Sequence, residues 1–145
     1  MAGRTRRVPL TSLVGAVSLN GGCLAPAKEI QVIRKNIIVN GKKCMDGENT
    51  ATISDKGAGA IEVKGHINTD TNCDELLMSV YTSKNSERII VEIIADTPAD
   101  VDCQTCESIY QYNSIIELNR APSRALVKYR VNGKMFGTVA ERSLS

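Results

Sequence analysis

The sequence of 145 residues contains no tryptophan, one phenylalanine and one histidine. Proteins that hold single-stranded nucleic acid stack the bases on aromatic side chains beside a basic groove, so this class of partner is not expected. The only histidine, His66, has no second histidine to join it in a metal site or a Ser-His-Asp triad. We therefore predict no metal site, no cofactor and no catalytic residue.

The chain also lacks an apolar run of the roughly 20 residues that are needed to cross a bilayer. Its N-terminus instead has a basic start, about a dozen mostly apolar residues and small residues before a cysteine, which is the pattern of an export signal. Residues 1–22 are predicted to be this signal peptide. The pair Arg6 and Arg7, which follows Thr5, is similar to the twin-arginine type of signal, which carries proteins that are already folded.

Residues 20–23, NGGC, are similar to a lipobox, in which the cysteine is lipidated after cleavage. We therefore predict a lipid on Cys23 and, through it, an extracytoplasmic protein anchored to the outer face of the cell membrane. Residues 23–29 contain proline and polar residues, and they are expected to form a tether. The alternative is that this segment is simply the N-terminus of a cytosolic protein.

The net charge of +2 belongs to the leader. Of the 18 lysines and arginines, three lie in residues 1–22, which contain no acidic residue. The remainder therefore has 15 basic residues against 16 acidic ones, which is close to −1. No basic surface for nucleic acid is implied.

The five cysteines make an odd number, which in an exported protein leaves one to explain. Lipidation of Cys23 would leave four, which are expected to form disulfides in an oxidising exterior. Three pairings are open. Because Cys103 and Cys106 are three residues apart in an extended segment, they point to opposite sides and should have different partners. The nested choice joins Cys73 to Cys103 and Cys44 to Cys106.

Two other roles for these cysteines are less favoured. A redox C-x-x-C motif opens a helix, which lowers the pKa of the attacking thiol, whereas Cys103 and Cys106 follow an acidic loop and precede a β-rich run. A zinc site of four cysteines needs two closely spaced pairs, and Cys44 and Cys73 are far apart in the sequence. A thiol-redox function remains an alternative.

The mature chain has the two-residue period of β-strands, and no segment shows the period of a helix. Residues 61–67, for example, alternate apolar or small residues with Glu62, Lys64 and His66, which places the two sets on opposite faces. The expected strands are residues 30–39, 51–55, 61–67, 75–84, 87–97, 107–119, 124–131 and 134–141. Seven or eight short strands predict an all-β domain over residues 30–145, an antiparallel immunoglobulin-like sandwich or barrel stapled by disulfides.

Local signals refine this expectation. Asn132-Gly133 is the strongest hairpin signal, Asn85-Ser86 is a second one, and Asn40-Gly41 is expected to end the first strand. A kink is possible at Lys35-Asn36, and the alternation slips at Asn113-Ser114 as a bulge would cause. Residues 68–73 read as a loop, and residues 87–97, the most apolar run, as a central strand.

Two groups of polar residues are candidate ligand sites. Oxygen ligands for calcium could gather if the disulfides drew the acidic loops together, but no EF-hand-like spacing exists, so solvated loops are favoured. Tyr110 and Tyr112 share one strand face, and they are expected to pack in the core rather than to form a carbohydrate platform. The acids concerned are Asp70, Asp74, Glu75, Asp96, Asp100 and Asp102.

Several motifs follow one another in a fixed order: CMDGENTATIS (44–54), IEVKGHI (61–67), NCDEL (72–76), RIIVEI (88–93), CQTCESIYQY (103–112) and PSRALVKY (122–129). Together with the twin-arginine leader, they resemble a group of small haloarchaeal lipoproteins. The resemblance covers about residues 44–130. It implies a surface-anchored β-domain of unassigned function, with no catalytic residues to carry over.

The predicted function is therefore a binding or interaction module at the cell surface, with an unknown ligand, rather than an enzyme. A second hypothesis is a structural component of the envelope that assembles by strand addition at an exposed sheet edge.

Overall fold

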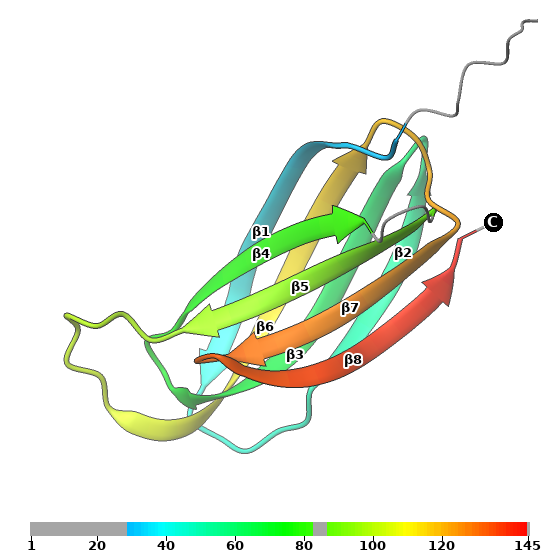
Figure 1. Cartoon of the computed structure of the whole chain (residues 1–145). Helices are drawn as coiled ribbons and strands as arrows, with labels where there is room; N and C mark the ends of the chain where they lie inside the picture. The colour runs from blue at the N-terminus through cyan, green and yellow to red at the C-terminus, as the bar shows by residue number, and fades with distance from the viewer. Residues whose placement is uncertain (1–28, 83–86, 145) are drawn as a thin grey trace, which may run out of the picture.

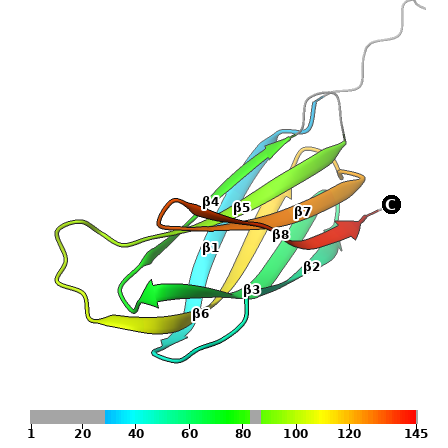
Figure 2. The ribbon, with the colours of Figure 1, turned by 60° about the horizontal axis from the view of Figure 1, so that its bottom comes forward.

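The structure is a computed structural model that describes residues 29–82 and 87–144. Two four-stranded sheets pack face to face as a sandwich, and the described residues contain no helix (Figures 1 and 2). The strands are β1 (Val32–Lys43), β2 (Thr50–Gly57), β3 (Ala60–Thr71), β4 (Glu75–Thr82), β5 (Arg88–Asp96), β6 (Thr105–Leu118), β7 (Arg124–Val131) and β8 (Lys134–Ser143). The predicted all-β sandwich with disulfides is confirmed, and its two separate sheets do not close into a barrel.

The first sheet has the strand order β1-β6-β3-β2 and the second has the order β4-β5-β7-β8. At the two sides of the sandwich, β1 contacts β4 and β2 contacts β8. One pair, β5 with β7, is parallel, so the second sheet is mixed rather than antiparallel throughout. The parallel pair arises because the chain leaves the second sheet after β5, forms β6 in the first sheet, and returns to begin β7 beside the start of β5.

The core lies between the sheets and follows the predicted alternation. On β3, Ile61, Val63 and Ile67 are at most 1% exposed, whereas Lys64 and His66 are exposed on the opposite face. The central strands β5 and β7 bury their inward aliphatic residues in the same way. Residues 87–97 were predicted to contain a central strand, and β5 is one.

The bulge predicted at Asn113-Ser114 is wrong. The inward face of β6 alternates without a break, and its register with β1 and β3 is continuous at this point. Ser114 takes a core position at 1% exposure because its hydroxyl donates a hydrogen bond of 3.1 Å to the Val63 carbonyl. The neighbouring Ile115 is left pointing outward, 37% exposed.

The predicted end of the first strand at Asn40-Gly41 is also wrong. The strand β1 continues to Lys43, with register shifts between Val32 and Arg34 and between Val39 and Gly41, and none at Lys35-Asn36. Asn40 forms an irregularity in the strand instead of a turn, and pairing with β6 resumes at Gly41.

Residues 68–71 belong to β3 rather than to a loop, and Thr69 is buried.

The two hairpin signals have different outcomes. Asn132 and Gly133 have φ angles of 48° and 85° and connect β7 to β8, as a type I′ hairpin requires. The strands β4 and β5 pair as predicted, but the turn expected at Asn85-Ser86 lies outside the described residues. No helix in the described part of the chain could span a membrane.

Candidate functional site

Four residues form a row across the outer face of the first sheet. Gly41 of β1 is paired with Gln111 of β6, Gln111 with His66 of β3, and His66 with Thr50 of β2. Gln111, His66 and Thr50 are exposed, and Thr50 Oγ1 lies 3.3 Å from His66 Nδ1. The glycine leaves open space at one end of the row, because a Cβ atom there would have only Gln111 Oε1 within reach, at 4.0 Å.

Two cavities meet at this row and share Thr50, His66 and Gln111. The first has a volume of about 370 Å³ and extends toward residues 44–49, with Ile109 and Met45 as its apolar lining. Its charged lining consists of Lys42, Lys43, Asp46 and Glu48.

The second cavity has a volume of about 390 Å³ and extends the other way, over Asn40, Thr52, Lys64 and Asn113. Its side chains are almost all neutral and polar. Asn113 Oδ1 is buried and has no hydrogen-bond partner within the described residues. We call the outer face of the first sheet around the row the hollow face.

The segment 44–49, which walls the first cavity, is fixed at three points. The disulfide Cys44–Cys106 joins it to the start of β6. Asn68 donates from Nδ2 to the Gly47 carbonyl, and its backbone N–H donates to Asn49 Oδ1, both at 2.7 Å. A Cβ atom on Gly47 would lie 2.9 Å from Ile109 Cδ1, so a glycine allows the segment to approach the sheet this closely.

Two buried tyrosines support the floor of the hollow face. The Tyr129 hydroxyl donates to the Thr50 carbonyl at 2.7 Å, and the Tyr112 and Tyr129 hydroxyls are 2.6 Å apart. Since Tyr129 has only one proton to give, Tyr112 must be the donor in that pair. Burial raises the pKa of Tyr112 to about 12, and that of Tyr129 is raised still further, so both hydroxyls are neutral.

The two hydroxyls occupy space that a side chain on β3 would need. A Cβ atom on Gly65 would lie 2.3 Å from the Thr50 carbonyl oxygen and 2.5 Å from the Tyr129 hydroxyl. Tyr110 and Tyr112 are each 1% exposed, so the prediction that they pack in the core is confirmed and neither forms a surface platform.

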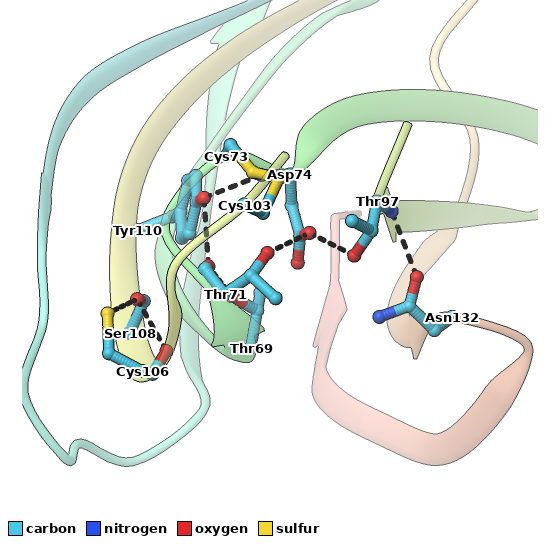
Figure 3. The surroundings of a disulfide bond; sticks show 10 residues. All are labelled: Thr69, Thr71, Cys73, Asp74, Thr97, Cys103, Cys106, Ser108, Tyr110 and Asn132. Carbon is cyan, nitrogen blue, oxygen red and sulfur yellow. Dashed lines mark hydrogen bonds between the residues drawn. A yellow bond between two sulfur atoms is a disulfide. The ribbon is translucent and has the colours of Figure 1, made fainter. Parts of the chain in front are cut away.

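The structure contains the nested pair of disulfides, Cys44–Cys106 and Cys73–Cys103. Both lie at the end of the sandwich where β1 ends and β6 begins, and Figure 3 shows the surroundings of Cys73–Cys103. The two cysteines of the C-x-x-C motif are therefore bonded to partners elsewhere and not to each other.

Asp74 is not the solvated loop acid that was expected. It is 7% exposed, its Oδ1 accepts hydrogen bonds from the Thr71 and Thr97 hydroxyls, and its N–H donates to the Tyr110 hydroxyl at 2.8 Å (Figure 3). Asn132 Oδ1 in turn accepts from the Thr97 N–H. This chain of bonds links β6 of the first sheet to the β7–β8 hairpin of the second, which is a structural role.

The other acids considered as calcium ligands are exposed as predicted, and no group of three or more potential metal ligands gathers within residues 29–82 and 87–144. They are Asp70, Glu75, Asp96, Asp100 and Asp102. A separate acidic contact involves Glu107, whose pKa is raised by the negative charge of Asp46, by burial, by a hydrogen bond with Asp46 and by the charge of Asp70.

The sequence marked His66 as an exposed strand residue but did not connect it with Thr50, Gln111 or Gly41. These residues come from four strands, and only the register of the sheet brings them into one row. The available signal was their outward position in the alternation of each strand. Arg6, Arg7 and Cys23 lie outside the described residues. No protein-family model, no curated protein and no solved structure matches this chain.

Proposed function

We propose that the protein is an exported, lipid-anchored binding module of the cell surface, with the hollow face as its ligand site. The observation that carries the proposal is the pair of cavities that meet at Thr50, His66 and Gln111 beside a wall fixed by a disulfide. Their volumes lie at the lower end of the range of about 300–1,000 Å³ found for small-molecule sites.

The chemistry of the lining favours a neutral ligand rich in hydroxyl groups, such as a carbohydrate. Six amide, hydroxyl or imidazole side chains line the two cavities: Asn40, Thr50, Thr52, His66, Gln111 and Asn113. Ile109 and Met45 would contact the apolar face of such a ligand.

The direction of β1 supports a surface role. This strand begins three residues after the start of the described chain and ends at Lys43, which lines the first cavity. Twelve extended residues span roughly 35–40 Å. An anchor at Cys23 would therefore hold the opposite end of the domain near the membrane and leave the hollow face accessible.

The binding site is tested by measuring the affinity of the full-length protein for neutral and uronic-acid-containing oligosaccharides. His66→Ala and Gln111→Ala should each weaken binding of the neutral ligand about tenfold, which corresponds to the loss of one hydrogen bond of about 1.4 kcal/mol. Ser79→Ala, on the outer face of the second sheet, is the matched control and should have no effect. Equal losses in all three variants, or no loss at His66 and Gln111, would refute the assignment.

Export and anchoring are tested separately. Replacement of Cys23 by Ala should abolish metabolic labelling with a radioactive fatty acid, and replacement of Arg6 and Arg7 by Lys should leave the precursor inside the cell. Unchanged labelling of the Cys23→Ala variant would refute the lipid anchor without affecting the hollow face. Support for export comes from the leader and from the two disulfides, which are typical of an oxidising compartment.

A further inference from the structure

The edge strand β1 differs from the three other edge strands of the sandwich. Eleven of its twelve residues are exposed, and no strand lies on its outer side within the described residues, since β1 is the end of its sheet. The exposed residues include Ile33 at 65% and Ile38 at 57%. An edge of this kind presents a row of backbone donors and acceptors to another extended chain.

The charge of β1 has one sign only. Arg34 and Lys35 lie near one end of the strand, Lys42 and Lys43 lie at the other, and β1 contains no acidic residue. None of the other edges is purely basic: β2 and β8 carry charges of both signs, and the only charged residue of β4 is Glu75. Cations on an edge strand oppose pairing with an identical strand, but they attract an acidic one.

A cleft lined mainly by apolar residues, with Tyr81 and Thr82 among them, lies beside the N-terminal part of β1. It has a volume of about 290 Å³ and is lined by Ile30, Val32, Val80, Tyr81 and Leu118 among others, so that it opens between the two sheets at the side where β1 contacts β4. An inward-pointing apolar side chain on a strand added to β1 would have this cleft to occupy.

We propose that β1 is a docking edge for an extended acidic segment of a partner protein, which adds to the first sheet as a further strand. Its backbone would bond to the free edge of β1, the carboxylates of its outer face would lie beside Arg34 and Lys43, and an apolar side chain of its inner face would enter the cleft. A second copy of the chain is disfavoured as the occupant, because β1 against β1 would bring eight cations together while neither strand contains an acid. This surface is the rim of the sheet, and it meets the hollow face at the end of β1, where Lys42 and Lys43 also line the first cavity.

The probe is a capped peptide of about ten alternating valines and glutamates, long enough for one strand, and its control has lysines in place of the glutamates. The full-length protein should bind the acidic peptide, more weakly as the salt concentration rises, and should not bind the basic one. The double variant Arg34→Glu/Lys35→Glu should lose about tenfold or more in affinity. Lys134→Glu, which changes a cation on the edge strand β8, should lose nothing.

Two proline variants test the backbone contacts. Alternate N–H groups of an edge strand point away from the sheet, so of Ile38→Pro and Val39→Pro one removes a bond to β6 and the other removes a free donor. The variant that keeps the thermal stability of the parent should lose peptide binding. If both unfold, hydrogen exchange of the parent decides, since the peptide should protect the amides of β1.

Several outcomes would overturn the proposal. They are equal binding of both peptides, full binding by the stable proline variant, protection of β8 or of the hollow face in place of β1, and self-association of the protein through β1 in the absence of peptide. None of these outcomes decides whether an oligosaccharide binds the hollow face, so the docking proposal can fail while the oligosaccharide site stands.

Discussion

The outer faces of the two sheets differ although their inner faces are built alike. On the second sheet, Ile90, Glu92 and Leu126 point outward and are nevertheless only 6–8% exposed. The Glu92 carboxylate pairs with the Arg130 guanidinium at 2.9 Å across β5 and β7. On the first sheet, the outward row ends in a glycine, and its His66 is exposed beside two cavities.

The difference teaches that the side chains on the solvent face decide where a sandwich has room for a ligand. On the two central strands of the second sheet, the outward aliphatic residues Ile90 and Leu126 are paired with each other and are almost fully buried. Hydroxyl and amide residues on the first sheet leave space, and the segment 44–49 supplies a wall. Both sheets share the inward alternation that forms the core, so the hollow face is formed without the loss of any core side chain.

The largest expected effect follows removal of the disulfide that fixes the wall. Cys44→Ser/Cys106→Ser opens a loop with a sequence separation of 62 and should lower the free energy of unfolding by about 4 kcal/mol. Cys73→Ser/Cys103→Ser, with a separation of 30, should cost slightly less, about 3.5 kcal/mol. Urea denaturation measures both. The NMR signal of His66 should shift far more in the first variant, and equal shifts would contradict the role of the wall.

Two glycine variants compare the packing beneath the hollow face, at Gly65, with the open space at the end of the row, at Gly41. Gly65→Ala drives a Cβ atom against the Thr50 carbonyl and the two tyrosine hydroxyls, so it should lower the free energy of unfolding by about 3 kcal/mol. Gly41→Ala is the matched control, since its Cβ atom meets only Gln111 at 4.0 Å, and it should change stability by less than about 0.5 kcal/mol. Similar losses in the two variants would show that the floor is not tightly packed.

Tyr129→Phe isolates the hydrogen bonds under the hollow face. It leaves the Thr50 carbonyl and the Tyr112 hydroxyl without their partner, which should lower the free energy of unfolding by about 2 kcal/mol. The control is Tyr81→Phe, because Tyr81 is 42% exposed. Thermal denaturation of both variants provides the comparison, and a Tyr129→Phe protein as stable as the parent would contradict the role of the hydroxyl pair.

The smallest expected effect is the pH dependence near the wall. Because the folded state raises the pKa of Glu107, the folded protein holds this proton more tightly than the unfolded chain, and its stability falls as the pH rises through that pKa. Glu107→Gln should therefore raise the melting temperature at neutral pH and have no such effect near about pH 3, where the carboxyl is protonated in both states. Glu117→Gln, which removes a pairing with Arg34, should not raise it. If the gain in melting temperature of Glu107→Gln persists at low pH, the charge of the carboxylate is not its cause.

Particular residues show how much of the fold could be predicted from the sequence. Alternation was sufficient for residues 61–67 of β3, and Asn132-Gly133 for the last hairpin, because local chemistry decides both. The predictions at Ser114 and at Asn40-Gly41 were wrong for two different reasons. A serine can be buried once a carbonyl of a neighbouring strand accepts a hydrogen bond from its hydroxyl. Pairing with β6 can continue a strand through an Asn-Gly pair. In neither case can the partner strand be inferred from the local sequence.

The hollow face was not predictable for a similar reason. Gly41, Thr50, His66 and Gln111 are ordinary outward residues of four separate segments, and only the strand order β1-β6-β3-β2 and its register bring them together. The wall depends in addition on which cysteines pair, and the sequence left three pairings open.

The most direct test of the binding role is a map of backbone amide shifts when the full-length protein is titrated with the neutral oligosaccharide that binds best. The largest shifts are expected at Thr50, His66 and Gln111, with little change on the outer face of β5 and β7. Shifts that are greatest at Ile90, Glu92 and Leu126, or a panel in which no oligosaccharide shifts the row, would contradict the assignment of the hollow face as the ligand site.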